Sequence, residues 1–127
     1  MPPLSRTKSW VMPETQMLSR RKIQLYNEFM ALVARYYKTQ HEVAFYAGEL
    51  NVTPRYLSQI THRVSGKSPK LLISDYLLHE IEQALVSTSA DMQQLALEYG
   101  FPSGAMFSKF FRQHTQTTPT EFRRRHV

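Results

Sequence analysis

The sequence predicts an all-α fold, and three observations support this prediction. Apolar residues recur every three or four positions from residue 20 to near the end of the chain, which is the spacing of helix faces. Several helix starts are marked by a hydroxyl side chain that precedes a proline. No segment shows the alternation of apolar and polar residues that is typical of strands.

The first 19 residues predict a linker or tail. They contain three prolines, Pro2, Pro3 and Pro13, and show little periodicity. An amphipathic helix is expected from Arg20 to Lys38, with one apolar stripe packed on a core. The stripe consists of Ile23, Leu25, Tyr26, Phe29, Met30, Leu32, Val33, Tyr36 and Tyr37.

Six shorter helices are predicted after this one. They cover about 42–50, 54–65, 69–86, 92–99, 104–115 and 119–125. Three of them follow a capping hydroxyl and begin with proline, after Thr53, Ser68 and Thr118. A proline is tolerated at the first helical position because the N–H that it lacks would be unpaired anyway. Capping boxes are expected after Asp91 and Thr118, since Gln or Glu stands three residues later.

A short helix with one polar face occurs twice, fifty residues apart. The apolar positions of the first copy are Leu57, Ile60 and Val64, and the matching face of the second copy consists of Ser103, Phe107, Phe110 and Phe111. Both copies end at a turn that leads into a proline, at 66–69 and 116–119. A repeated polar-faced helix suits a partner with a periodic surface. Double-stranded DNA is the expected partner.

Each polar-faced helix is predicted to be the second helix of a helix-turn-helix unit. Such a unit needs a small residue where its helices cross and a turn residue that tolerates a positive φ. Ala47 and Asn51 meet these needs in the first copy. Ala96 and Gly100 meet them in the second.

The predicted organisation is a linker or tail at 1–19 and one DNA-binding domain at 20–127. Helix-turn-helix units are expected at about 42–66 and 91–115, joined by a linker helix at about 69–86. At 1.5 Å per residue the linker helix spans roughly 27 Å. This length is close to the ~34 Å between successive major-groove faces once the flanking units add their width.

The composition excludes several classes of function. The 127 residues include 16 Lys and Arg against 10 Asp and Glu, and the net charge of +6 suits a polyanionic partner. The absence of cysteine excludes disulfides, thiolate metal sites and cysteine nucleophiles. Because the five histidines form no His-x-x-x-His pair, no metal is expected. No apolar run is long enough to span a membrane and no signal peptide opens the chain, which predicts a cytoplasmic protein.

No enzyme motif is visible either. The chain has no glycine-rich phosphate loop and no nucleophile elbow, so neither catalytic residues nor a cofactor are expected.

From about Arg20 to Arg125 the chain resembles the DNA-binding domain of the AraC/XylS family of bacterial transcription regulators. The most specific stretches are 95–103 (LALEYGFPS), 107–112 (FSKFFR) and 118–123 (TPTEFR). The resemblance implies seven helices, two helix-turn-helix units and recognition helices that enter successive segments of the major groove. Two positions depart from the family. Gln116 stands where glycine is usual, and Tyr76 stands where arginine is common.

The resemblance also implies which residues contact DNA. The implied base contacts are Arg55, Ser58 and Gln59 in the first recognition helix, and Gly104, Ala105, Ser108 and Lys109 in the second. Arg55 can bind guanine and Gln59 can bind adenine, each through two hydrogen bonds, whereas Gly104 and Ala105 have no side-chain hydrogen bond to offer. Phosphate contacts are expected from His62, Arg63, Arg112, Arg123 and Arg124, and Arg125 extends the last run.

Two alternatives stay open at this point. The chain could be a helical protein-interaction module that docks RNA polymerase or another protein without binding DNA. Family members commonly carry an effector or dimerisation domain on the N-terminal side. Nothing in this sequence looks like one, so the chain is expected to be a fragment that lacks its effector domain, with a short free-standing regulator as the second possibility.

Overall fold

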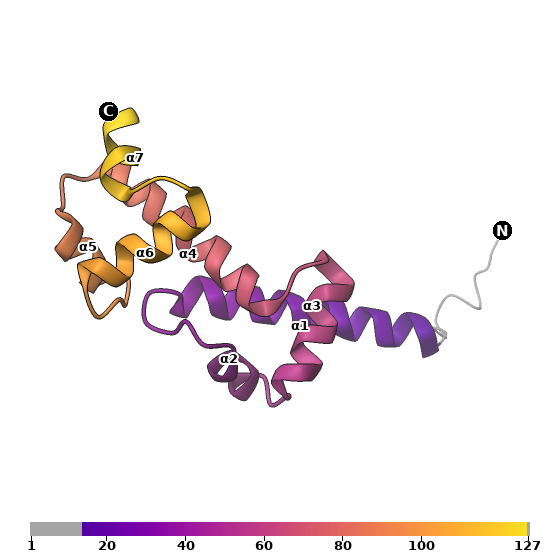
Figure 1. The fold of residues 1–127 in the computed structure, drawn as a ribbon. Helices are drawn as coiled ribbons and strands as arrows, with labels where there is room; N and C mark the ends of the chain where they lie inside the picture. The colour runs from indigo at the N-terminus through magenta and orange to yellow at the C-terminus, as the bar shows by residue number, and fades with distance from the viewer. Residues whose placement is uncertain (1–13, 127) are drawn as a thin grey trace.

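The computed structural model describes residues 14–126, which form seven helices and no strand (Figure 1). The helices are α1 (Glu14–Tyr36), α2 (Val43–Glu49), α3 (Pro54–Ser65), α4 (Pro69–Ser87), α5 (Met92–Glu98), α6 (Gly104–Thr115) and α7 (Pro119–Arg125). The predicted all-α fold is confirmed. The bounds of the last six helices agree with the sequence within one residue at each end.

The start of the first helix was predicted wrongly. Helix α1 begins at Glu14, six residues before the expected start at Arg20. Residues 14–18 (ETQML) are mostly good helix formers and contain no proline. The prediction gave too much weight to the prolines of the first 13 residues, and the part of the predicted tail at 1–13 lies outside the described residues.

Local hydrogen bonds explain where the helices begin. The hydroxyls of Thr53, Ser68 and Thr118 each accept a hydrogen bond from the backbone N–H three residues later. Both predicted capping boxes, at Asp91 and Thr118, are formed. In the second box, hydrogen bonds from the backbone and side chain of Thr118 hold the pKa of the Glu121 carboxyl below its usual range.

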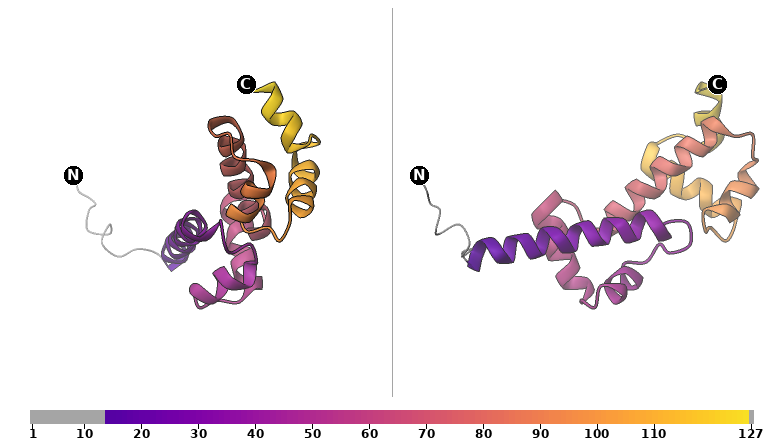
Figure 2. Two further views of the ribbon diagram at one scale, coloured as in Figure 1. Left: turned by 90° about the vertical axis from the view of Figure 1, so that its left-hand side faces the viewer. Right: turned by 180° about the vertical axis from the view of Figure 1, so that it is seen from behind.

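The helices form two lobes that share α4 (Figure 2). The first lobe consists of α1, α2, α3 and the start of α4, and its buried core is Phe29, Val33, Tyr46, Ala47, Leu57, Leu72 and Ile73. The second lobe consists of the rest of α4 with α5, α6 and α7, and its buried core is Leu77, Ile81, Ala84, Leu85, Leu95, Ala96, Tyr99, Phe107 and Phe111. Because α4 contributes to both cores, its 19 residues couple the two lobes mechanically.

A second connection joins the lobes at the end of α1, and we call it the inter-lobe contact. The ring of Tyr37 lies 5.1 Å from that of Tyr76 on α4 and 6.2 Å from that of Tyr99, and its hydroxyl donates a hydrogen bond to Glu80 at 3.3 Å. Burial, and then the charge of Glu80, raise the pKa of Tyr37 to about 12. The Tyr37 hydroxyl therefore stays neutral and can donate this bond throughout the physiological range.

Two further residue pairs extend the inter-lobe contact. Lys38 forms an ion pair with Glu98 at 3.0 Å, and the ring of His41 lies 5.3 Å from that of Phe101. The hydrogen bond with Glu98 raises the pKa of the Lys38 ammonium. These contacts hold the loop that follows α1 against the turn that follows α5.

Within residues 14–126, four residues have a positive φ, and each one ends a helix or forms a turn. They are Asn51 (56°), Gly66 (76°), Gly100 (83°) and Gln116 (64°). The positive φ expected in the two helix-turn-helix turns is confirmed. Gln116, which stands where the family usually has glycine, also adopts the left-handed conformation. The Cβ of any other residue at position 100 would clash with the backbone carbonyl oxygen of Lys38, whereas a Cβ at position 66 would meet no atom.

We expect Gly100→Ala to destabilise the protein more than Gly66→Ala. Both substitutions put alanine at a similar positive φ, which costs about 1–2 kcal/mol. The Gly100 variant must also displace the carbonyl of Lys38, and overpacking of this kind adds about 1–3 kcal/mol. Denaturant unfolding of both variants measures the difference. Equal losses would show that the turn after α5 is not held against the end of α1.

We expect Gln116→Gly to stabilise the protein slightly. Glycine removes a left-handed strain of about 1–2 kcal/mol, and the greater freedom of the unfolded chain returns roughly half of it. The net gain of about 0.5–1 kcal/mol should raise the melting temperature by about 3 °C. Gly66→Gln, which makes the opposite change at the matching position of the first lobe, is the control and should lower it. A lower melting temperature for Gln116→Gly would contradict the strain argument.

Candidate nucleic-acid interface

The first helix-turn-helix unit packs α2 against α3 through a tight turn. The backbone N–H of Val52 donates to the carbonyl of Ala47 at 3.0 Å, and Ala47 is buried where the two helices approach. In α3 the side chains of Leu57 and Ile60 are buried in the lobe. Burial of this apolar face leaves the polar face of α3 directed to solvent.

The predicted contact residues of the first unit lie together on that outer face. Arg55, Gln59, His62 and Arg63 are exposed, and Ser58 is half-buried. The imidazole of His62 is held by its own helix, since Nδ1 lies 2.8 Å from the Ser58 carbonyl oxygen and 3.2 Å from the Ser58 hydroxyl. The side chain of His62 is therefore already ordered on the surface of α3.

The second unit has the same turn, followed by a loop that is one residue longer. The N–H of Phe101 donates to the carbonyl of Ala96 at 2.8 Å, which is the matching bond 49 residues later. The two recognition helices nevertheless begin fifty residues apart, at Pro54 and Gly104. The loop between the turn and the recognition helix is therefore one residue longer in the second unit than in the first.

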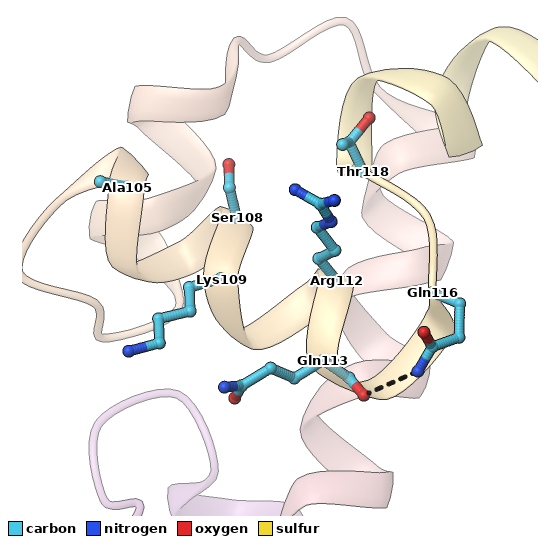
Figure 3. Close-up of a pocket in the computed structure, with 7 residues that line it drawn as sticks. All are labelled: Ala105, Ser108, Lys109, Arg112, Gln113, Gln116 and Thr118. Carbon is cyan, nitrogen blue, oxygen red and sulfur yellow. Dashed lines mark hydrogen bonds between the residues drawn. The ribbon is translucent and has the colours of Figure 1, made fainter.

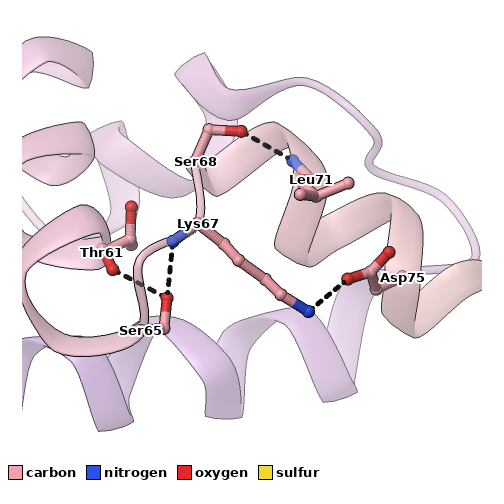
Figure 4. A network of polar contacts seen from close by, with 6 residues as sticks. All are labelled: Thr61, Ser65, Lys67, Ser68, Leu71 and Asp75. Carbon is pink, nitrogen blue, oxygen red and sulfur yellow. Dashed lines mark hydrogen bonds and ion pairs between the residues drawn. The ribbon is translucent and has the colours of Figure 1, made fainter.

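The exits from the two recognition helices do repeat at fifty residues. Ser65 donates to the carbonyl of Thr61 and accepts from the N–H of Lys67 (Figure 4). Thr115 makes the matching pair of bonds, to the carbonyl of Phe111 and from the N–H of Thr117. Lys67 also forms an ion pair with Asp75 of α4 at 3.1 Å. The turn that follows each recognition helix is thus held by the hydroxyl of the helix's last residue, Ser65 or Thr115.

Four of the predicted contact residues of the second unit line one open depression on α6. The depression has a volume of about 620 Å³ (Figure 3). Its lining consists of Ala105, Ser108, Lys109, Arg112, Gln113, Gln116 and Thr118. Lys109 and Arg112 are exposed, and none of the seven residues is acidic. The surface is positively charged and open to a large partner.

Gly104 lies beside the end of a side chain from α5. A Cβ at this position would lie 2.7 Å from Oε1 of Gln93, the end of a flexible, exposed side chain that can move aside. What Gly104 presents to a partner is backbone.

Arg123 is held by the protein itself. Its Nε donates to the carbonyl of Leu85 at 2.9 Å, and a terminal guanidinium nitrogen donates to the carbonyl of Thr88 at 3.3 Å. These carbonyls lie at the C-terminal end of α4, where a cation is favourable. Arg123 thus joins α7 to the linker helix, whereas Arg124 and Arg125 are exposed.

Sequence reasoning missed several residues beside the predicted ones. Lys22 of α1 and Tyr56 line a depression together with Gln59, His62 and Arg63. Lys70 and Lys109 line another depression, which lies between the lobes. Lys22 stands four residues before Tyr26 on the apolar stripe of α1, and this spacing is the one signal that could have placed it beside the core.

Among the side chains of residues 19–126, no three from His, Asp or Glu are grouped so that they could hold a metal ion. None of the helices described is long and apolar enough to cross a membrane.

Comparison with known proteins gives a consistent result. A family model for a helix-turn-helix domain matches residues 46–125. An AraC-type DNA-binding transcriptional regulator from Chromobacterium violaceum is 27% identical, with a TM-score of 0.72 over 86% of this chain and 95% of that one. No curated protein sequence matches.

Two further structures share the fold. The C-terminal domain of AraT, a response regulator from Geobacillus stearothermophilus, is 21% identical, with a TM-score of 0.72 over 81% of this chain and 85% of that one. The DNA-binding domain of AdpA, a global transcriptional factor solved with a target DNA, is 18% identical, with a TM-score of 0.69 over 76% of this chain and 87% of that one. With two helix-turn-helix units on a shared linker helix, this chain belongs to the AraC-type helix-turn-helix family of DNA-binding transcription regulators.

Proposed function

We propose that the chain reads duplex DNA in a sequence-specific way, with α3 and α6 in successive segments of the major groove. The observation that carries this proposal is that α4 and the inter-lobe contact hold two polar, basic recognition faces at a fixed separation. The 19 residues of α4 span roughly 28 Å at 1.5 Å per residue. Together with the width of the flanking units, this length suits the ~34 Å between successive major-groove faces.

The two recognition helices differ in what they can read. On α3, the exposed Arg55 can donate two hydrogen bonds to guanine, and Gln59 can pair with adenine in the same way. On α6, Ala105 offers only a methyl contact with thymine, and Ser108 offers a single hydroxyl. We infer that the first lobe contributes most of the direct base readout.

Phosphate contacts are assigned to the exposed cations around the two faces. His62 and Arg63 flank the first face, and Arg112 flanks the second. We propose that Arg124, which is exposed at the end of α7, contacts a phosphate. Arg123 is not proposed as a phosphate contact, because its guanidinium binds the end of α4.

The cellular setting of the domain is part of the same proposal. AraT carries its similar domain at the C-terminal end of a response regulator. By analogy, we propose that this chain acts with an effector or dimerisation domain on its N-terminal side, in the cytoplasm, and that RNA polymerase is a partner of the intact regulator.

We expect binding to DNA to weaken steeply as the salt concentration rises. Each phosphate that is neutralised releases counterions, so log K falls linearly with log salt. Fluorescence anisotropy with a random duplex at 50 and 200 mM salt measures this slope. A module that docks only proteins would bind no DNA and show no slope, and that result would overturn the proposed function.

We expect Arg55→Ala to reduce specificity and Lys109→Ala to reduce affinity. A target site is first obtained by selection from a randomised duplex pool. Arg55→Ala should then cost about 1–3 kcal/mol on this site and relax the preference at one or two base pairs. If the exposed ammonium of Lys109 contacts a phosphate instead of a base, Lys109→Ala should weaken binding to all sequences similarly. Loss of the same base preference in both variants would contradict the division of roles between the two helices.

A further inference from the structure

Near the N-terminal end of α1, a lysine, Lys22, continues the face of the helix that carries the buried apolar residues. Phe29 and Val33 on this stripe are fully buried in the first lobe, and Tyr26, one turn earlier, is half-buried. Lys22 occupies the next position on the same face and is also half-buried. Because α1 packs against α3, the aliphatic part of the half-buried Lys22 can lie against the lobe while its ammonium reaches solvent at the edge.

Lys22 lies beside the recognition face. It shares one open depression of about 430 Å³ with Tyr56, Gln59, Ile60, His62 and Arg63 of α3. This depression contains two permanent cations, Lys22 and Arg63, and no carboxylate. The side chains of residues 19–126 form two ion pairs, Lys38 with Glu98 and Lys67 with Asp75, and neither pair involves Lys22 or Arg63.

An anion is the natural occupant of such a depression. Two cations held beside each other repel, and a phosphate between them removes that cost and forms charge-assisted hydrogen bonds. The hydroxyl of Tyr56, whose side chain is exposed, adds a neutral donor of the kind that often contacts DNA phosphates. Gln59, an assigned base contact, lines the same depression, so the cations lie at the edge of the groove segment that α3 would enter.

We propose that Lys22, with Tyr56 and Arg63, binds a DNA backbone phosphate beside the groove segment read by α3. In this arrangement α1 is part of the DNA-binding surface as well as part of the core. The inference rests on the proposed function, because the phosphate belongs to the duplex that α3 and α6 read. It adds a helix that neither the repeat nor the family resemblance assigned to DNA.

The test compares Lys22→Met with Arg35→Met. Methionine keeps the packing of the aliphatic stem and removes the charge, so both variants lose one positive charge from the same helix. Arg35 lies 13 residues after Lys22, about 220° around the helix axis at ~100° per residue, and its guanidinium lies over the ring of Tyr36. It therefore controls for net charge without sharing the surface.

The expected result is a change in the salt dependence of Lys22→Met alone. Losing one phosphate contact should lower the slope of log K against log salt by about 0.9. The loss of affinity relative to wild type should therefore shrink about 3.5-fold between 50 and 200 mM salt. At any one salt concentration, Lys22→Met should lose the same factor of affinity for the selected site as for a random duplex. Lys22→Arg should keep the wild-type slope, and thermal melts should show that every variant is folded.

The location of the contact is tested by phosphate ethylation interference. Wild type and Arg35→Met should show interference at a phosphate beside the groove segment that α3 reads. Lys22→Met should lose this interference. If wild type binds DNA with a steep slope but Lys22→Met matches Arg35→Met in slope and interference, the role of Lys22 is overturned and the proposed function stands. If wild type shows no salt-dependent binding, both are overturned.

Discussion

The arrangement of the two recognition helices depends on the contact between the end of α1 and the turn after α5. Tyr37 packs against Tyr76 and Tyr99, and Gly100 lets the backbone of the second unit reach the carbonyl of Lys38. Helix α4 alone would fix the distance between the lobes along one axis. The inter-lobe contact adds a second attachment away from that axis, and two attachments also restrict rotation. In the proposed function, such a rigid separation would let one chain address two groove segments without reordering itself on binding.

The same rigidity explains how unequal recognition helices can act together. The first lobe carries Arg55 and Gln59, which can each form paired hydrogen bonds with a base, whereas α6 exposes Ala105 and a depression with positive charge. A rigid connection to α3 would bring α6 to DNA in a defined register, where backbone contacts add affinity. In this view the second lobe mainly positions the domain, while the first supplies most of the discrimination between bases.

The second lobe also devotes basic residues to its own stability. Arg123 lies in the run at the C-terminal end of the chain that looks like a phosphate-binding tail, yet its guanidinium binds carbonyls at the end of α4. This bond ties α7 to the linker helix and satisfies acceptors that the helix end leaves unpaired. Net charge therefore overstates the number of cations that are available to DNA.

The sequence by itself determined the features that depend on residues a few positions apart. Caps at Thr53 and Asp91, the positive φ of Asn51, and the bounds of the short helices all follow from such local chemistry. The family was likewise readable, because its motif runs through these same turns. The start of α1 was missed because helix formers stand directly after prolines there.

Only the tertiary structure decided the features that depend on contacts between distant residues. Arg123 meets Leu85 across 38 positions, and Lys38 meets Glu98 across 60. The approach of the Gln93 side chain to Gly104 and the place of Lys22 beside α3 belong to the same class. No short-range pattern encodes such pairs, since helix periodicity states which face is buried and not which residue it will meet.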